Sequence, residues 1–354
     1  MTAIPDRTAD HPSASTESLQ HQKMNVNQQI VIVGTGGTIS SRYDPSQGRS
    51  VASQQVEKIV ALLPDQTGLP RLEFQNFATI GSFEMTMEIA HELVKYVAEL
   101  LARTDVGGVV VTQGTDTMEE TSFLADLLLP SGKPVVFTGA QLPHDHPQTD
   151  GPRNLEDSIR AAASPNTVGL GVMVCFNGQL HTARDVTKVH TSALETFQSY
   201  EHGALGCVDA RHIVIYRRPE LRLSLSADKL DKRVDLIEAG LGIDARPIDT
   251  ALAAGVDGIV VKAFGRGNAT TDFGRGVSRA CAAGVPVVVT SRCPSGRVKA
   301  IYGSGGGGGR DLEDAGAIFA GDIKGPKARV LLTVALSNPN TRSRLRELFH
   351  TIAP

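Results

Sequence analysis

Short apolar runs alternate with segments of helical periodicity through the first half of the chain. Strand-like runs cover 30–33, 71–77, 107–111, 134–137 and 169–174, and apolar residues recur at helical spacing over 86–102, 118–129 and 154–163. A short continuous apolar run is typical of a strand buried on both faces, and its alternation with helices indicates βαβ units. We therefore expect a parallel sheet with helices on both faces and mostly right-handed crossovers.

This alternation stops at 213–232, a charged stretch without a clear period. It resumes with strand-like segments at 234–237, 258–261 and 285–290 and helical segments at 248–254, 274–283 and 328–336. Because domain boundaries fall in polar stretches, the interruption predicts a linker. The expected organisation is a polar, disordered tail at 1–28, a larger α/β domain at 29–212 with a mainly parallel sheet flanked by helices, a linker at 213–232, and a smaller C-terminal α/β domain at 233–354.

Composition narrows the class of protein. The chain has 354 residues, 41% hydrophobic and 21% charged, which is typical of a globular protein with two domains. A net charge of −3 without a Lys/Arg cluster argues against a nucleic-acid surface. The sequence also has no run of about 18 apolar residues, the length that a membrane-spanning helix needs. The four cysteines have no C-x-x-C spacing and the histidines no zinc pattern, so we expect no metal site. The polar N-terminus lacks the apolar run of a secretory signal and favours a cytoplasmic location.

Two threonine-containing loops directly follow predicted strands. Gly-Thr-Gly-Gly-Thr-Ile at 34–39 follows the first strand, and Thr-Gln-Gly-Thr-Asp-Thr-Met-Glu-Glu-Thr at 112–121 follows the third. Ligands of parallel α/β sheets bind outside the carboxyl ends of the strands, so Thr38, Thr115 and Asp116 are candidates for a paired hydroxyl site. A threonine hydroxyl needs a base or a lowered barrier to act as a nucleophile.

A structural role remains open for the second loop, because Thr115 or Thr117 would also serve as the N-cap of the following helix. Lys188, in Ala-Arg-Asp-Val-Thr-Lys, would be a base if desolvated in a pocket, although most lysines are solvated surface residues. Gly-Ser-Gly-Gly-Gly-Gly at 303–308 fits G-x-G-x-x-G literally, but it does not open a helix directly after a strand. We interpret it as a flexible loop rather than a nucleotide site.

Several motifs together resemble the bacterial L-asparaginase family. Their order and separations match that family from about residue 29 to the C-terminus, and they are Thr35–Ile39, Gln113–Glu120, Asp150–Leu155, Arg184–Lys188 and Lys327–Leu332. The resemblance implies a larger and a smaller α/β domain, hydrolysis of the side-chain amide of L-asparagine to L-aspartate and ammonia, and no metal or organic cofactor. The alternatives are a glutaminase-asparaginase that also takes L-glutamine, the amide-hydrolysing subunit of a tRNA-dependent amidotransferase, and a non-catalytic amino-acid-binding relative.

The resemblance also implies roles for individual residues. Thr38 would be the primary nucleophile, and Thr115, Asp116 and Lys188 would form a second polar cluster in which Lys188 tunes the Thr115 hydroxyl. The family's catalytic tyrosine, in the loop after the first threonine, falls here on Arg49 or Ser50. We expect Tyr43 to replace it as the phenol of a mobile lid over 40–50, because such loops close to exclude water.

Substrate-binding roles follow in the same way. Ser82 would hold the substrate α-carboxylate and Asp116 its α-amino group. Backbone N–H groups near Thr115, including the adjoining Gly114, and at Ala140 would supply the oxyanion hole. Phe83 stands where the family usually has glutamine after the serine.

One expected contact crosses between chains. The family places each active site between the large domain of one subunit and the small domain of another. Asn268, in a polar glycine loop without an evident structural role, would reach the site of a neighbouring subunit. The family's neighbour-subunit glutamate is not evident here. We therefore expect a homo-oligomer, specifically a homotetramer of two tight dimers.

Overall fold

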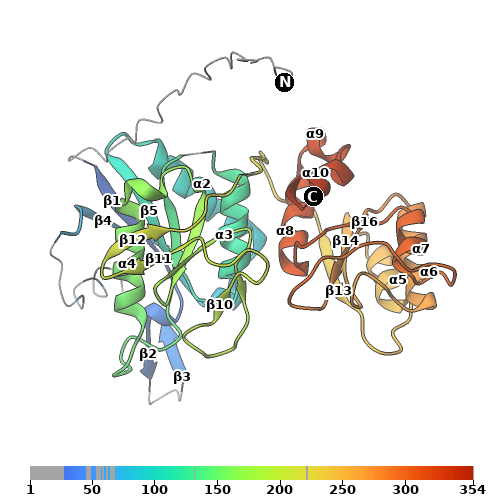
Figure 1. Ribbon diagram of the computed structural model, residues 1–354, viewed down its shortest axis with the longest axis horizontal. Coiled ribbons are helices and arrows are strands. Elements are labelled where there is room, and N and C mark those ends of the chain that lie inside the picture. The colour runs from blue at the N-terminus through green and yellow to red at the C-terminus, as the bar shows by residue number, and fades with distance from the viewer. Residues whose placement is uncertain are drawn as a thin grey trace, which may run out of the picture.

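The described residues of the computed structural model, 28–44, 49–52, 57, 60, 63, 68–130, 132–220 and 222–353, form two α/β units (Figure 1). The larger unit contains an eight-stranded sheet and the smaller one a four-stranded sheet. The disordered tail predicted at 1–28 lies, up to residue 27, outside the described residues.

The larger sheet has a parallel centre. Its strand order is β12-β11-β8-β7-β6-β5-β1-β4. Parallel pairing joins β4 (Leu72–Ile80), β1 (Gln29–Gly36), β5 (Val106–Thr112), β6 (Val135–Thr138) and β7 (Val172–Phe176). The register pairs Gly34 with Thr112 and Thr112 with Thr138. Three neighbouring strands therefore end at one level, and the loops after them meet at one edge of the sheet.

Helices cover both faces of this sheet, as the apolar periodicity predicts. Alternate residues of β1 point to opposite sides: Val31 and Val33 pack in the cluster that contains α2 (Met87–Ala102) and α3 (Met118–Leu128). Ile30 and Ile32 pack on the other side, in the cluster that contains α4 (Gly151–Ala163). Burial on both faces explains why β1 reads as a continuous apolar run.

The far side of the larger sheet is antiparallel. The strands β8 (Gln179–Thr182), β11 (Gly206–Asp209) and β12 (His212–Ile215) extend it beyond β7, and the two-residue strands β9 (Thr187–Lys188) and β10 (Phe197–Gln198) form a separate ladder. β12 pairs with β11, so residues 213–215 of the predicted linker are part of the larger sheet. A four-residue strand with alternating exposure carries too little apolar periodicity to be separated from a linker.

The smaller unit repeats the layered arrangement. Its parallel sheet has the order β13 (Val234–Glu238), β14 (Gly258–Ala263), β15 (Val287–Ser291) and β16 (Ile318–Phe319). Its helices are α5 (Arg246–Ala253), α6 (Thr271–Ala282), α7 (Gly309–Asp314), α8 (Gly325–Ser337), α9 (Pro339–Arg342) and α10 (Leu345–Ile352). The cluster on one face includes α5 and α6, whereas Val260 and Val288 on the other face pack with α8 and α10.

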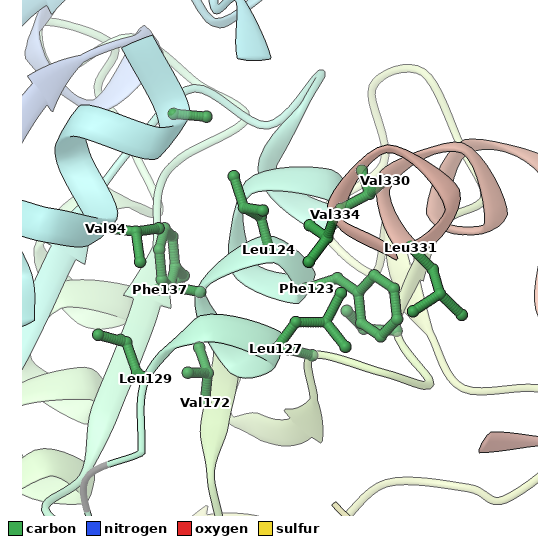
Figure 2. Packing of buried hydrophobic residues seen from close by; sticks show 14 of the residues in the cluster. Val94, Phe123, Leu124, Leu127, Leu129, Phe137, Val172, Val330, Leu331 and Val334 are labelled. Atoms are coloured by element: carbon green, nitrogen blue, oxygen red, sulfur yellow. The ribbon is translucent and has the colours of Figure 1, made fainter. Parts of the chain in front are cut away.

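The two units share one apolar core where α8 meets α3. Figure 2 shows Val334 and Leu331 of α8 beside Leu124 and Phe123 of α3, and all four belong to one buried cluster. Burial of these side chains joins the units through packing as well as through the chain connection. Among the described residues, no helix is both long enough and apolar enough to cross a membrane.

Candidate active site

Glycines bring the first two loops into backbone contact at the carboxyl edge of the larger sheet. Gly36 and Gly37 adopt φ of +101° and +82°, in the left-handed region that favours glycine. A Cβ on Gly37 would lie 2.2 Å from the backbone nitrogen of Gly114, and one on Gly36 would lie 2.5 Å from the Ile80 carbonyl oxygen. No side chain fits at either position. Thr38, which is half-buried, therefore begins directly beside the loop that carries Thr115.

The hydroxyl of Thr115 lies in a polar cluster with Asp116 and Lys188. Lys188 Nζ donates to Thr115 Oγ1 at 2.8 Å and to Asp116 Oδ1 at 2.7 Å. Thr115 is 4% exposed and the Lys188 side chain 15%, whereas the Asp116 side chain is 55% exposed. The predicted contact between Lys188 and Thr115 is thus present. An amine at this distance can exchange a proton with the hydroxyl, which is the geometry that acid–base catalysis requires.

The backbone of Lys188 is held by two elements. Lys188 pairs with Phe197 in the β9–β10 ladder, and its N–H donates to Glu119 Oε2 at 3.3 Å. Glu119 lies in the first turn of α3, directly after the Thr115 loop. From the sequence, Glu119 was a helix-compatible acidic residue and nothing more, because its acceptor role depends on a segment 69 residues further along the chain.

Ser82 connects the Thr115 loop to the end of β4. Asp116 N donates to Ser82 Oγ at 3.2 Å, and Thr117 Oγ1 donates to Ser82 O at 2.8 Å. A Cβ on Gly114 would lie 2.6 Å from Ser82 Oγ, so the close approach of this hydroxyl requires glycine there. Ser82 is buried, whereas Phe83 is 75% exposed.

These contacts show whether the hydroxyls of Thr115 and Thr117 cap helix α3. Thr117 is the N-cap residue of α3, but its side chain makes no capping hydrogen bond. Its hydroxyl instead donates to Ser82. Thr115 is bonded to Lys188. The hydroxyls of both threonines are therefore used to build the loop cluster rather than to cap the helix.

The third loop, after β6, is shaped by the Asp150–Leu155 motif. Gln113 N donates to Thr138 O at 2.9 Å, and Ala140, two residues further, is fully buried. Asp150 accepts from the N–H groups of Gln141 and Leu142, and Asn154 Nδ2 donates to Gly139 O at 3.0 Å. These bonds fix the backbone at Ala140, the position expected to contribute to an oxyanion hole.

The predicted lid is described only as backbone. Ser41–Asp44 (β2) and Arg49–Ala52 (β3) form an antiparallel hairpin in which Tyr43 pairs with Ser50. The Tyr43 side chain and residues 45–48 lie outside the described part of the chain. The proposed role of Tyr43 and the closure of the lid remain predictions.

Asn268 has a structural role within its own chain, contrary to the expectation from sequence. Its Oδ1 accepts the N–H of Gly309 at 3.0 Å, and its backbone forms an isolated bridge with Phe264. The sequence could not show this, because Gly309 follows 41 residues later. Whether Asn268 also reaches a neighbouring subunit stays a prediction.

Backbone N–H groups of the glycine run at 303–308 bind a carboxylate of the same chain. Asp311 accepts from the backbone N–H groups of Ser304, Gly305, Gly306 and Gly308. These hydrogen bonds, the one from Ser304 above all, lower the pKa of Asp311. The N–H groups that a nucleotide phosphate would require are already engaged, which agrees with the interpretation of this run as a loop.

Comparisons with known proteins match this arrangement along most of the chain. The family described as "Asparaginase, N-terminal" matches residues 29–221, and "Glutaminase/Asparaginase C-terminal domain" matches residues 233–349. The chain is 36% identical over 324 residues to a probable L-asparaginase of Deinococcus radiodurans, covering 90% of this chain and 96% of that protein. It is 32% identical over 324 residues to a glutamyl-tRNA(Gln) amidotransferase subunit of Archaeoglobus fulgidus, covering 87% of this chain and 75% of that protein.

A solved structure agrees with the fold. The crystal structure of a probable cytoplasmic L-asparaginase from Campylobacter jejuni superposes with a TM-score of 0.82 at 29% sequence identity. The match covers 92% of this chain and 99% of that one. Both domains, rather than the larger one alone, therefore have counterparts in this relative.

Proposed function

The chain belongs to the asparaginase family, and from this premise we propose that it is an L-asparaginase with a threonine nucleophile. It would hydrolyse the side-chain amide of L-asparagine to L-aspartate and ammonia. The observation that carries the proposal is the contact of Lys188 Nζ with Thr115 Oγ1 at 2.8 Å, next to the glycine turn that leads to Thr38.

In this proposal Thr38 attacks the amide carbon with its hydroxyl oxygen. The hydroxyl proton passes to the departing nitrogen as the C–N bond breaks, and ammonia leaves an ester of aspartate on Thr38. Water then hydrolyses the ester and restores the hydroxyl. Backbone N–H groups at the Thr115 loop and at Ala140 would stabilise the oxyanion of each tetrahedral intermediate.

The second cluster would prepare the site for these steps. Lys188 would tune the Thr115 hydroxyl through the hydrogen bond that it donates, and the Asp116 carboxylate holds the Lys188 amine in place. Asp116 is also exposed enough to meet the α-amino group of the substrate. Ser82 Oγ, which is fixed by Asp116 N, would donate to the α-carboxylate.

A broader specificity is the second candidate. The matched C-terminal family description covers glutaminases, and a relative at 32% identity is named as part of an amidotransferase. Phe83 departs from the family pattern, because the family usually has glutamine at this position, and the structure describes its side chain as exposed. We propose L-asparagine as the preferred substrate and L-glutamine as the competitor to test.

The deciding experiment measures ammonia released from L-asparagine and from L-glutamine by purified protein. Thr38→Ala and Thr115→Ala should each lose about 10³-fold or more in kcat, the scale of losing a nucleophile. Thr250→Ala is the matched control, because this exposed threonine lies on α5 in the smaller domain.

The outcomes separate the alternatives. Near-normal turnover in Thr115→Ala contradicts the paired-threonine mechanism. A protein without turnover that is still stabilised against heat by L-asparagine is an amino-acid-binding relative. A larger kcat/KM for L-glutamine than for L-asparagine makes it a glutaminase. We also propose cytoplasmic location, activity that survives dialysis against a chelator, and a homotetramer.

A further inference from the structure

Lys327 is a buried cation close to the candidate site that the proposed mechanism does not use. It lies in the first turn of α8, in the smaller domain, and is 2% exposed. Its Nζ donates to Arg184 O at 2.9 Å and also to Val186 O. The Nζ lies 5.8 Å from the centre of the Phe123 ring. A lysine is rarely buried to this degree without a specific partner, so its position calls for a role.

The two carbonyls that Lys327 binds belong to the segment that delivers Lys188. Val186 is two residues before Lys188, and the strand that contains Lys188 has only two residues. Such a short ladder fixes the chain weakly. Lys327 therefore holds this segment from the smaller domain, while Glu119 holds the Lys188 N–H from the larger one.

Electrostatics agree with a fixed position for Lys327. Burial lowers its pKa to about 8, and the carboxylates of Glu119, Asp185 and Asp126 counteract that effect. The nearby Arg184 guanidinium acts in the same direction as burial. A lysine amine donates hydrogen bonds in both protonation states, so the two carbonyls keep a donor on either side of this value.

We propose that Lys327 is a positioning residue for Lys188. By holding the carbonyls of Arg184 and Val186, it keeps Lys188 Nζ within hydrogen-bond reach of Thr115. Docking of the smaller domain on the larger one then becomes a condition for a competent second cluster. This inference rests on the proposed function, because that function gives Lys188 its role.

A double-mutant cycle tests the inference. Lys327→Met should lower kcat by about 10- to 100-fold, since a displacement near 1 Å can cost about 10²-fold. KM should change by less than about threefold, because the hydrogen bond from Asp116 N to Ser82 Oγ, which joins the two residues expected to bind the substrate, does not involve Lys188. In a Lys188→Met background, Lys327→Met should lower kcat no further, because two residues that act through one contact are not additive. Lys327→Gln, which keeps an N–H donor, should recover part of the loss.

The matched control lies in the same helix. Leu336 is buried at the opposite end of α8 from Lys327, and its side chain lies against Gly258 in β14 of the smaller domain's own sheet. Leu336→Ala should lower the unfolding temperature, because it leaves a cavity in the core. Its kcat should stay within about twofold of the unsubstituted protein at temperatures where both are folded. This variant separates loss of stability from loss of positioning.

A crystal structure of Lys327→Gln or Lys327→Met supplies a readout independent of turnover. The distance from Lys188 Nζ to Thr115 Oγ1, now 2.8 Å, should exceed hydrogen-bond reach in Lys327→Met. An unchanged distance, an unchanged kcat, or a full further loss in the Lys188→Met background overturns the inference. Absence of ammonia release from the unsubstituted protein contradicts the proposed function instead, and the crystallographic distance still decides the role of Lys327.

Discussion

Replacing Asp322 by asparagine should destabilise the junction between the two domains. Arg184, in the larger domain, donates from Nη1 to Asp322 Oδ2 at 3.0 Å and from Nη2 to Asp322 Oδ1 at 2.9 Å. His202 Nε2 lies 3.0 Å from Asp322 Oδ2. The Asp322 side chain is only 3% exposed, so this is a bidentate ion pair with little access to solvent.

The pKa of Asp322 sets the size of the effect. Burial alone would raise this pKa, but the hydrogen bonds and charge of Arg184, together with the hydrogen bond of His202, lower it from 3.8 to about 2. That difference corresponds to about 2 kcal/mol of stability at pH 7. Removing one partner of a buried pair typically costs about 3–5 kcal/mol. Because Arg184 keeps its bonds to Asp185 and to Ile352 O, we expect about 2–3 kcal/mol for Asp322→Asn.

The pH dependence has a definite sign. A carboxylate whose pKa is lower in the folded state contributes stability that is fully present above the unfolded value of 3.8. That contribution is lost as pH falls through about 2. The difference in stability between the unsubstituted protein and Asp322→Asn should therefore shrink over this window.

The assay is urea unfolding at pH 7 and at acidic pH, at one fixed protein concentration. Asp249→Asn is the matched control, since Asp249 accepts from Arg279 Nε and Nη2 in the same bidentate manner but with side chains 45% and 51% exposed. An exposed pair contributes less than about 1 kcal/mol. Equal losses in the two variants, or a difference that persists unchanged to pH 2, would refute the reasoning.

Three further predictions concern the site and its assembly. Gly37→Ala should abolish activity and lower the unfolding temperature, because a Cβ there would lie 2.2 Å from Gly114 N. The control Gly240→Ala, whose Cβ would meet nothing within 4 Å, should change neither activity nor the unfolding temperature. An active Gly37→Ala protein would contradict the close approach of the two loops. Tyr43→Phe should lower kcat by about 10²-fold or more if Tyr43 supplies a proton-transferring phenol, and full activity in this variant would exclude that role. Light scattering should give the mass of a tetramer, and an active monomer would overturn the predicted assembly.

The parts of the fold that the sequence predicts best are those where burial is complete. Residues 30–33 and 107–111 are core strands on both faces, so every position is apolar. Helix starts were predicted two or three residues late at Gly151, Arg246 and Gly325. In all three helices proline occupies the first turn, where its missing N–H costs nothing. The apolar periodicity begins only after this turn, so it predicts a later helix start.

The antiparallel edge of the larger sheet was not predicted, for a related reason. Its strands, Gln179–Thr182, Gly206–Asp209 and His212–Ile215, have four residues each and are partly exposed. Their pairing is set by turns such as the one at Ala210 and Arg211, which have positive φ without being glycine. No local pattern of apolar residues marks such a turn. The strand predicted at 169–174 starts later, at Val172, because Gly169 and Gly171 have positive φ.

The residues of the candidate site also differ in how far the sequence alone could predict them. Thr38 and Thr115 could be predicted from position alone, because each follows a buried strand at the edge where ligands bind. Lys188 contacts Thr115 across 73 residues. The sequence alone offered it as a base only if a pocket desolvates it, and the resemblance to a family placed it with Thr115. Glu119 and Lys327 had no sequence signal for the contacts they make, since a buried lysine and a helix-start glutamate look ordinary until the fold brings their partners together.

The residues of the candidate site should differ in how they respond when the fold loosens. Thr38 and Thr115 follow central strands whose positions are set by a fully buried core, and Ser82 is tied to the Thr115 loop by hydrogen bonds within the larger domain. Lys188 instead depends on a two-residue strand and on side chains from α3 and α8. Local opening begins where buried apolar contacts are fewest. Loosening of the junction between α3 and α8 should therefore lower kcat through Lys188 before it weakens substrate binding through Ser82.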